Sequence, residues 1–476
     1  MSADRDARPR NVLSRPVVTG AVIALLVRGA LASAPAAEVD DGYPGRLPGD
    51  ASVVSCPAVA PEPMVSLPLA RAVDIALCNN AQIRDAWVNI RVQAAALGQA
   101  KAAYWPTLTA NVTELEDRTG YPGTAVPTTT RAQDTIYGSF TWRLFDFGGR
   151  AATRRAAEST LEAAVASRDA TIQKILSSVI QAYFDAVTEK AVIDNKTEDE
   201  DLARSTLAST QRKQAQGGGA QSDTLQAAAA LARVSLDKNR AMGEYEKALA
   251  GLVYALGLPP NTSLTLPNDV DLPTGYEEQD LAAWLKETEQ HHPAILAARA
   301  AVEAAHEQVA VAKSSGRPTL DLTADYYQNG FPGQGLSNSN SKVTTVGLSV
   351  TVPLFDGFAT HYKVQGAQAL AKSKEAELQD TEQQTLMQVV QAHAVAQSSL
   401  RNLHVSVDLM QAAQAALESS QRRYHSGAAD IMELLSTQSA LADARYERVR
   451  CLAEWRTARL TVLTSAGLLN SVNVQQ

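Results

Sequence analysis

The chain has 476 residues, a formal net charge of -8 at pH 7 and a pI near 5.5. This acidic balance, without any Lys/Arg-rich tract, argues against a nucleic-acid partner. After the N-terminal region no run of about 20 apolar residues occurs, so the sequence supplies no membrane-spanning helix there. Cys56, Cys78 and Cys451 are too few for a disulfide scaffold, although Cys56 and Cys78 can close one loop in an oxidising compartment.

The N-terminal region has the pattern of a secretory signal. Four arginines precede an apolar run over residues 17–27, and small residues follow it. Residues 1–37 are therefore predicted to be a signal peptide, and the mature chain is expected to be exported. Residues 38–66 are rich in Pro, Gly and Ala and are predicted to form an extended N-terminal arm.

The rest of the chain is an internal two-fold sequence repeat. With a shift of 210, Gly217 falls on Gly427, and near the start of each copy the shift is 212. Such self-similarity indicates one architecture built from two units rather than two unrelated domains. The predicted repeats and connections are 67–258, a linker over 259–280, 281–468 and a C-terminal tail over 469–476.

Each repeat contains one very long helical segment. In the first repeat, residues 151–216 include neither Gly nor Pro and consist mostly of residues with high helix propensity. They predict a single helix of about 65 residues, roughly 98 Å long at 1.5 Å per residue. The short helix before it and the medium helix after it together have a similar length, so we expect them to stack end to end along the long helix.

Between the short and the long helix, the hydrophobic period changes from about 3.6 to 2. Val346, Leu348 and Val350, for example, alternate with polar residues. Four strands are predicted in two hairpins, near 106–115, 135–145, 318–327 and 344–355. One apolar and one polar face are typical of a transmembrane barrel with lipid outside and water inside. Four strands cannot close a barrel, so partner chains are required to cover the sheet edges.

The sequence has no residues that favour an enzyme. It contains no Gly-rich phosphate loop, nucleophile elbow or Cys/His cluster, so we predict no catalytic activity, no cofactor and no metal. His291 and His292 stand at a helix start in the place of Asn79 and Asn80, so no metal role is expected of them. The acidic run at 198–201 lies within the long helix and is interpreted as a solvated face rather than a cation site.

Several motifs accompany the doubled layout. They are Trp105-Pro106-Thr107-Leu108 and Arg317-Pro318-Thr319-Leu320 before the hairpins, the Leu-Phe-Asp turns after them, and Arg423-Tyr424-His425-Ser426-Gly427 near the far turn of the second repeat. With these motifs the chain resembles the TolC family of outer-membrane efflux proteins over residues 67–468. The resemblance implies a mainly α fold with a transmembrane β part. In it, a trimeric 12-stranded outer-membrane β-barrel continues into a 12-helix periplasmic α-barrel, and each chain is an internal two-fold repeat.

The resemblance also implies a location and partners. The protein is expected as a homotrimer in the outer membrane, in contact with its lipid, extending through the periplasm to a membrane-fusion adaptor and an inner-membrane ABC or other exporter. Its predicted function is the exit duct of a type I secretion or efflux system, for a secreted protein (a toxin) or small molecules. The alternative is a periplasmic coiled-coil adaptor or scaffold without a pore, which has no need of paired strands with an apolar face.

The resemblance places a periplasmic gate at the far helix turns. Asp223 and Glu433 each lie shortly after a turn glycine, so a trimer would put carboxylates from both repeats around one opening. Glu433 matches an aspartate of the family's entrance ring, and Tyr424 matches a tyrosine that links neighbouring helix pairs in the closed state. The chain departs from the family at Ser436 and Ala429, where an acid and an arginine are usual. The alternative is that both acids complement a helix dipole.

The positions of Cys56 and Cys78 resemble the branch of the family that serves type I secretion. That resemblance implies a Cys56–Cys78 disulfide, which would clip the N-terminal arm to the start of the first repeat. Cys451 aligns with Ala241 in the first repeat and is expected to stay free.

Overall fold

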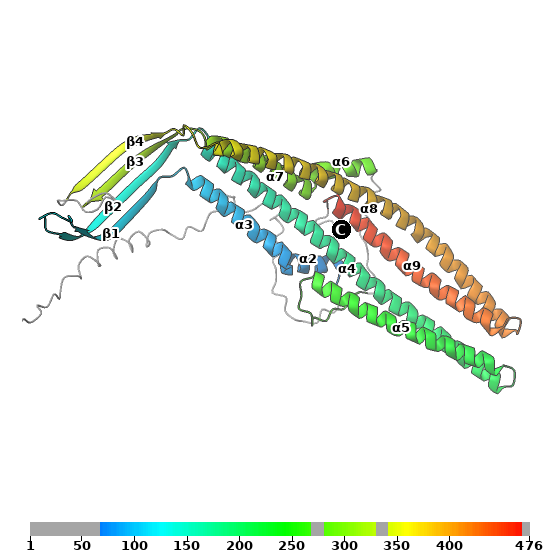
Figure 1. The fold of residues 1–476 in the computed structure, drawn as a ribbon. Helices are drawn as coiled ribbons and strands as arrows, with labels where there is room; N and C mark the ends of the chain where they lie inside the picture. The colour runs from blue at the N-terminus through cyan, green and yellow to red at the C-terminus, as the bar shows by residue number, and fades with distance from the viewer. Residues whose placement is uncertain (1–66, 268–279, 330–340, 469–476) are drawn as a thin grey trace, which may run out of the picture. The chain divides into compact units, whose positions relative to one another are not determined.

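The computed structural model describes residues 67–267, 280–329 and 341–468 (Figure 1). The predicted signal peptide, the extended arm, the C-terminal tail and Cys56 lie outside the described residues. Within the described part, each repeat has the same order of elements: two short helices, a β-hairpin, a very long helix and a medium helix. The doubled layout that the sequence predicts is therefore present, with one further helix of 11 residues before each short helix.

The helices of the two repeats correspond in order and in length. The first repeat contains α2 (Leu69–Asn79), α3 (Ala81–Ala102), α4 (Gly149–Ala215) and α5 (Gln221–Ala255). The second contains α6 (Leu281–His291), α7 (Pro293–Ser314), α8 (Ala359–His425) and α9 (Ile431–Ser465). The long helices α4 and α8 have 67 residues each, which confirms the single long helix predicted from the absence of Gly and Pro.

A capped break separates the two short helices of each repeat. In the first repeat, the Asn80 side chain accepts a hydrogen bond from the Gln82 amide at 2.8 Å. In the second repeat, Nδ1 of His292 accepts from the Ala294 amide at 3.2 Å. His292 is thus a helix N-cap in the place of Asn80, which accounts for the histidine in structural terms.

One glycine packs against each of these breaks. Gly257 has φ 69° and Gly467 has φ 73°, a left-handed conformation that favours glycine. A Cβ on Gly257 would come within 2.8 Å of the Asn79 carbonyl oxygen, and one on Gly467 within 2.8 Å of Cδ2 of His292. The end of each medium helix therefore meets the start of a short helix at a position where only glycine fits.

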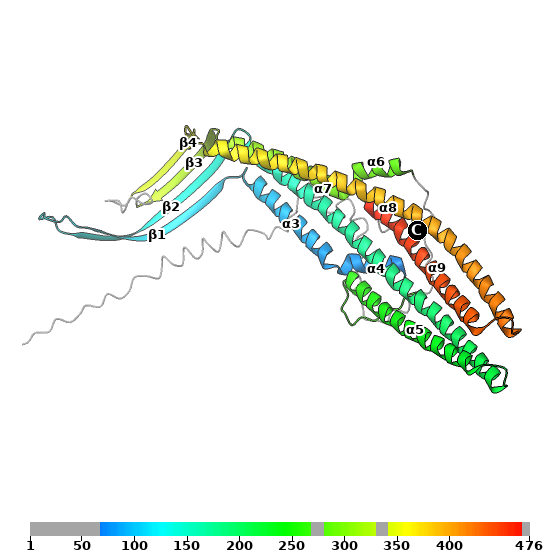
Figure 2. The same cartoon turned by 45° about the vertical axis from the view of Figure 1, so that its right-hand side comes forward.

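Helix α4 is the central element of the described chain. It packs against α3, α5, α7 and α9, and two views show it running between α5 and α9 (Figures 1 and 2). Both α3 and α5 line α4, as predicted. Tyr183 and Phe184 on α4 are buried against Val73 of α2 and Leu252 of α5. Burial of each such side chain contributes about 1.5–3 kcal/mol, which fixes where α2 and the end of α5 meet α4.

The strands form one antiparallel sheet, in the order β1 (Thr107–Thr119), β2 (Thr129–Phe145), β3 (Thr319–Gln328) and β4 (Lys342–Thr351). One row of directly paired residues is apolar: Leu108, Phe140, Ala324 and Val346. The next row is polar: Thr109, Ser139, Asp325 and Thr345. Because side chains alternate along a strand, the two rows lie on opposite faces. The register therefore gives the sheet the apolar and the polar face that the sequence predicts.

The strands differ from their predicted bounds at several ends. Strands β1 and β2 have 13 and 17 residues, more than the roughly 9–11 that a membrane-spanning strand needs. Their pairing continues past the alternating segment as far as Thr119, which pairs with Thr129, so hydrophobic alternation underestimates the length of the hairpin. Strand β4 ends at Thr351 rather than near 355. Pro353 follows it and has no N–H to donate to a neighbouring strand.

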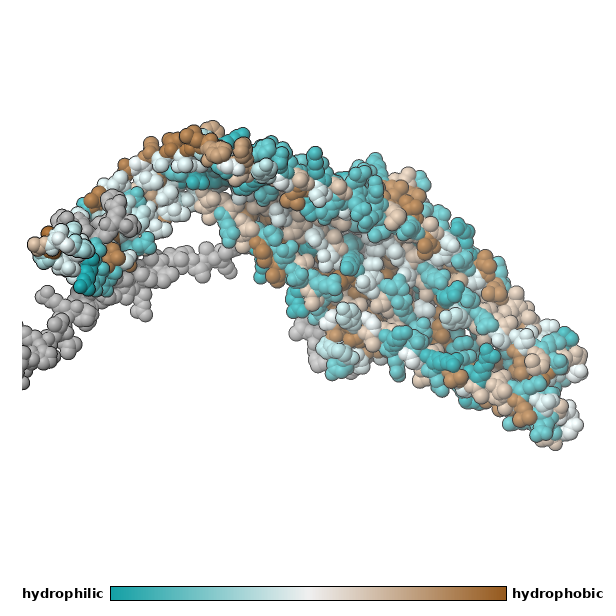
Figure 3. Space-filling model, viewed as in Figure 1, coloured by the Kyte–Doolittle hydropathy of each residue, from teal (hydrophilic) through white to brown (hydrophobic). Residues whose placement is uncertain are grey.

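Exposed apolar side chains gather where the strands meet the long helices (Figure 3). They include Leu354, Phe355 and Phe358, each at least 64% exposed in the isolated chain. Such a cluster of exposed apolar side chains indicates a surface that another phase or another chain covers. None of the described helices is long and apolar enough to cross a membrane.

Candidate functional site

The two far turns, from α4 to α5 and from α8 to α9, lie at the same end of the helices, away from the sheet (Figure 1). Gly217 and Gly427 both have φ 77°. After Gly217, the Gly218 amide donates to the Lys213 carbonyl oxygen at 3.0 Å, and the second turn has the equivalent bond at 2.8 Å. The repeats therefore present equivalent helix starts, those of α5 and α9, at one end.

The predicted gate acids both lie in the first turn of a helix. Asp223 is in the first turn of α5, and Glu433 is in the first turn of α9. Asp430 caps α9 by accepting a hydrogen bond from the Glu433 amide at 2.8 Å. A carboxylate at this position complements the helix dipole. The alternative interpretation, in which both acids are ordinary helix-end acids, therefore also fits both positions.

Glu433 also has a partner of opposite charge. The Arg423 guanidinium, at the end of α8, lies 2.6 Å from its Oε1. The pair is about half exposed on the arginine side, so it contributes little to stability. Its consequence is electrostatic, because the charge of Glu433 is balanced within its own chain.

Tyr424 lies against the other repeat. It is only 6% exposed, although it stands next to the turn. Lys213 Nζ, from the end of α4, donates to the Tyr424 carbonyl oxygen at 2.9 Å and lies 3.8 Å from the centre of its ring. Burial raises the pKa of Tyr424, and the negative charge of Asp223 raises it further. The structure thus brings Tyr424 near Asp223 and Lys213, while Glu433 belongs to a separate ion pair.

Lys213 and Arg423 are the site residues that the sequence reasoning left out. The repeat itself carries the signal that would have found them, since the 210 shift superposes Lys213 on Arg423. Each is a cation in the last turn of a long helix. Basic side chains there interact favourably with the helix dipole, and that ordinary role conceals their contacts across the turns.

The acidic run at 198–201 is not simply a solvated face, and that interpretation is wrong for two of its members. Asp199 is 7% exposed, and Arg445 of α9 lies 3.5 Å from its Oδ1. Glu200 accepts hydrogen bonds from Lys238 and Ser235 of α5, at 2.9 and 2.8 Å. The partners come from helices distant in sequence, so local charge patterning could not reveal them.

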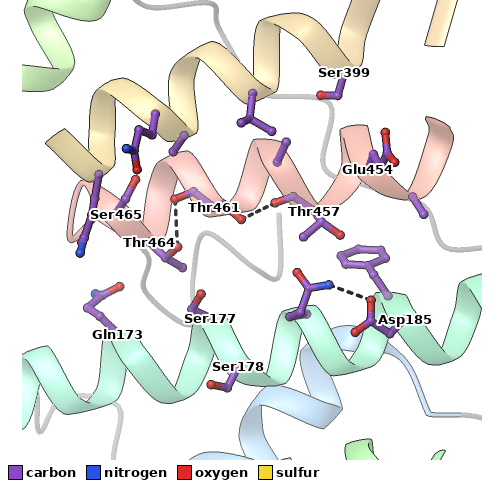
Figure 4. Close-up of a pocket in the computed structure, with 18 of the residues that line it drawn as sticks. Gln173, Ser177, Ser178, Asp185, Ser399, Glu454, Thr457, Thr461, Thr464 and Ser465 are labelled. Carbon is purple, nitrogen blue, oxygen red and sulfur yellow. Dashed lines mark hydrogen bonds between the residues drawn. The ribbon is translucent and has the colours of Figure 1, made fainter. Parts of the chain in front are cut away.

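A pocket of about 1080 Å³ lies between α4, α8 and α9 (Figure 4). Its lining includes hydroxyl and amide side chains, among them Gln173, Ser177, Ser399, Thr457, Thr461 and Thr464. The hydroxyls of Thr461 and Thr464 donate to carbonyl oxygens of their own helix, at 2.8 and 3.0 Å. These hydroxyls are bonded within their own helix and do not converge on one ligand. Among the residues that the structure describes, no group of His, Cys, Asp or Glu could hold a metal ion.

The cysteines fall into two classes. Cys78 is disulfide-bonded, and Cys451 is free and buried. Cys56 lies outside the described residues, so its pairing with Cys78 stays a prediction.

The model of the outer membrane efflux protein family matches residues 72–258 and 284–468. The chain belongs to this family. The two matched segments are the two repeats, and the family resemblance seen in the sequence is confirmed. Members of this family are outer-membrane channels, so the protein is an outer-membrane efflux or secretion channel that extends into the periplasm.

Individual relatives agree with this assignment. The chain is 34% identical to Protein CyaE of Bordetella pertussis, covering 88% of each chain. It is 23% identical to the proteases secretion protein PrtF of Dickeya chrysanthemi, covering 73% of this chain and 76% of that one. The crystal structure of the outer membrane protein VceC from Vibrio cholerae superposes with a TM-score of 0.74 at 22% identity, over 84% of this chain and 96% of that one.

The fold of this family confirms the predicted fold class. This chain is mainly helical with a transmembrane β part. In the trimer, a barrel of strands continues into a barrel of helices. Each chain supplies four strands and an internal two-fold repeat.

Proposed function

We propose that three copies of this chain form the exit duct of a type I secretion system. In this assembly, a secreted protein passes from an inner-membrane ABC exporter and a periplasmic membrane-fusion adaptor, through the helical barrel and the strand barrel, to the exterior. The observation that carries the proposal is the likeness to Protein CyaE over 88% of both chains. The likeness to a protein named for protease secretion points the same way.

The sheet supports assembly as a trimer. Strands β1 and β4 stand at the two ends of the strand order, so each has one edge without a partner among the described strands. Open edges are not tolerated in a lipid core, because every unpaired backbone N–H and C=O there costs several kcal/mol. Three copies that pair β1 with β4 of the next chain remove all of these edges.

The sheet also weighs against the pore-less adaptor or scaffold. An adaptor in the periplasm gains nothing from an apolar row such as Leu108, Phe140, Ala324 and Val346 on one face of paired strands. Exposed in water, that face would promote aggregation. A lipid-facing barrel makes the same residues favourable.

Small-molecule efflux by the same duct is the second candidate. The family model is described as an efflux protein. The pocket between α4, α8 and α9 is not arranged around one ligand, so it gives no preference for a small molecule over an unfolded polypeptide. The inner-membrane transporter therefore decides the cargo.

The test is reconstitution of secretion. The mature chain, expressed with the ABC exporter and adaptor from its own organism in a host that lacks its own outer-membrane duct, is expected to restore release of the exporter's protein substrate. It is also expected to fractionate with the outer membrane as a cross-linkable trimer. Restored resistance to toxic small molecules without protein release would favour the efflux candidate. A soluble periplasmic monomer would contradict both.

A further inference from the structure

The acidic residues 198–201 in the middle of α4 contact two different helices, α5 and α9. Glu200 faces α5, where it accepts from Lys238 and Ser235. Glu198 and Asp199 face α9, where the Arg445 guanidinium lies 3.1 Å from Oε2 of Glu198 and 3.5 Å from Oδ1 of Asp199. Helices α4 and α5 form the first helical hairpin, and α8 and α9 form the second. Neighbouring positions on α4 therefore hold the first helical hairpin together and attach the second one to it.

The contact between α4 and the second helical hairpin is mainly polar from this level down to the far turns, with Leu202 of α4 packed against the apolar cluster of α8 and α9. Asp199, Thr206 and Lys213 follow one another at heptad spacing on α4. Asp199 pairs with Arg445, Thr206 accepts from Gln438 Nε2 at 2.8 Å, and Lys213 donates to the Tyr424 carbonyl oxygen. We call this row of contacts the inter-hairpin seam.

The second hairpin itself is held in a different way. Leu417 of α8 and Leu434 and Leu441 of α9 form a buried apolar cluster between its two helices. Apolar burial of this kind contributes about 1.5–3 kcal/mol per side chain, whereas a buried ion pair repays little beyond its own desolvation. The α8–α9 hairpin is therefore a firm unit, joined to α4 by the mainly polar seam and by Leu202.

Among the seam contacts, loss of the ion pair between Arg445 and Asp199 is expected to cost the most free energy, because it leaves a buried charge. Asp199 is 7% exposed, and among the described residues its Oδ2 accepts no hydrogen bond, with the Lys196 ammonium 3.7 Å away. Arg445 is 25% exposed and its backbone carbonyl accepts from Asn195 Nδ2 at 3.5 Å. Removal of Arg445 leaves a buried carboxylate with one distant cation. Its desolvation is relieved by water entering the seam or by protonation of Asp199, whose pKa burial already raises.

This ion pair lies partway between the pocket and the turns. Along α4 it is about 21 Å from Lys213, and along α9 about 18 Å from Glu433, at 1.5 Å per residue. A small change of angle at this level is therefore amplified at the gate residues.

We propose that Arg445 is a positioning residue for the gate: through Glu198 and Asp199 it fixes the resting angle of the α8–α9 hairpin against α4, and so the contact between Lys213 and Tyr424. The effect on conduction rests on the proposed function, whereas the effect on the seam does not. The two are tested by separate measurements.

The seam is tested with a reporter cysteine, Thr206→Cys, in a chain in which the free Cys451 on α9 is replaced by Ala. Thr206 is buried beside Gln438, so in the assembled protein a water-soluble maleimide is expected to label the reporter slowly. Arg445→Ala is expected to raise the labelling rate about tenfold, since ~1.4 kcal/mol of lost stabilisation corresponds to a factor of ten. Arg445→Lys keeps a cation and is expected to restore part of the protection. Arg240→Ala is the matched control, because Arg240 pairs with Asp237 within α5 and is 70% exposed.

A second variant guards against failure to fold. Arg445→Met with Asp199→Asn removes both charges, so no charge is left buried alone, and it is still expected to raise the labelling rate. If both Arg445 variants assemble and label as slowly as the parent, the proposal is overturned.

Single-channel recording on the same variants tests the gate. Leak conductance is expected to rise in the order of the labelling rates, with the Arg445→Lys variant intermediate. Faster labelling with an unchanged leak, in a protein that conducts, would overturn the positioning role. If the parent and all variants fail to conduct while the labelling rates still differ, the duct function fails and the role of Arg445 in the seam stands.

Discussion

Lys213 at the end of α4 and Tyr424 at the end of α8 are joined in two ways. The Lys213 ammonium donates to the Tyr424 carbonyl oxygen at 2.9 Å and stands 3.8 Å from the centre of the Tyr424 ring. One contact uses the Tyr424 backbone and the other uses the face of its ring, and neither uses the phenolic O–H. The contact ties the first hairpin to the second beside the turns, where the family resemblance places the gate.

The first prediction follows from those two contacts. Lys213→Met keeps an unbranched side chain one heavy atom shorter and removes the charge, so it is expected to raise the leak of reconstituted single channels. A partly desolvated cation–π contact is worth about 1–2 kcal/mol, which corresponds to roughly 5- to 30-fold. Tyr424→Phe keeps the ring and the carbonyl and is the matched control, with a leak near that of the parent. A larger leak for Tyr424→Phe than for Lys213→Met would show that the hydroxyl carries the contact instead.

The second prediction concerns block by divalent cations from the periplasmic side. Carboxylates around a pore bind cations, but Glu433 is already balanced by Arg423 at 2.6 Å, whereas Asp223 accepts a hydrogen bond from the neutral Ser222 hydroxyl at 3.2 Å. Asp223→Ala is therefore expected to weaken the block more than Glu433→Ala. Arg423→Ala releases Glu433 and is expected to strengthen the block. Equal block in the parent and in the variant with both acids replaced would place the constriction elsewhere.

The third prediction tests which sheet face meets lipid. Val350 pairs with Leu320 on the apolar face, and Ser349 pairs with Asp321 on the polar face. Val350→Arg is expected to cost roughly 2–4 kcal/mol of barrel stability, the usual penalty for arginine at mid-membrane depth. Ser349→Arg places the same side chain in water, beside an acid, and is expected to cost much less. Denaturant unfolding in lipid vesicles measures both, and equal costs would contradict the assigned facing.

The repeat, the long helices and the two sheet faces could be predicted because each rests on a local pattern. Residues 151–216 contain no Gly or Pro that would end a helix, and strict alternation of apolar and polar residues fixes the faces of a strand. Asp223 and Glu433 could be located for the same reason, since the repeat shift superposes them.

The contacts that join the repeats could not be predicted in this way. Arg445 is distant in sequence from Asp199, and Lys213 from Tyr424, and nothing in the local sequence of either partner requires the other. The acidic run at 198–201 has the composition of a solvated face, and only the approach of α9 buries one of its members. Pairings between amphipathic helices depend on their rotation and register, which polar heptad positions specify only after the helices have met.

The last prediction is a pH dependence confined to one of the two helix breaks. Nδ1 of His292 accepts the hydrogen bond that caps α7, and a protonated imidazole cannot accept it. Burial lowers the pKa of His292 below its ordinary value of 6.5, so the folded chain favours the neutral ring. As the pH falls through about 6.5, the open state takes up the proton first. The stabilisation by this cap is therefore complete above that pH and is lost as the pH falls toward the lower pKa of the folded state.

Hydrogen exchange measures this loss at the first turn of α7. The protection factor of the Ala294 amide, corrected for the intrinsic pH dependence of exchange, is expected to fall as the pH is lowered from 7.5 through the ordinary histidine pKa of about 6.5. The Gln82 amide, capped by Asn80 in the first repeat, is the internal control and is expected to stay constant. His292→Asn transfers the first repeat's cap to the second and is expected to abolish the pH dependence while keeping the protection. A pH dependence that survives in the His292→Asn variant would assign the titration to another group.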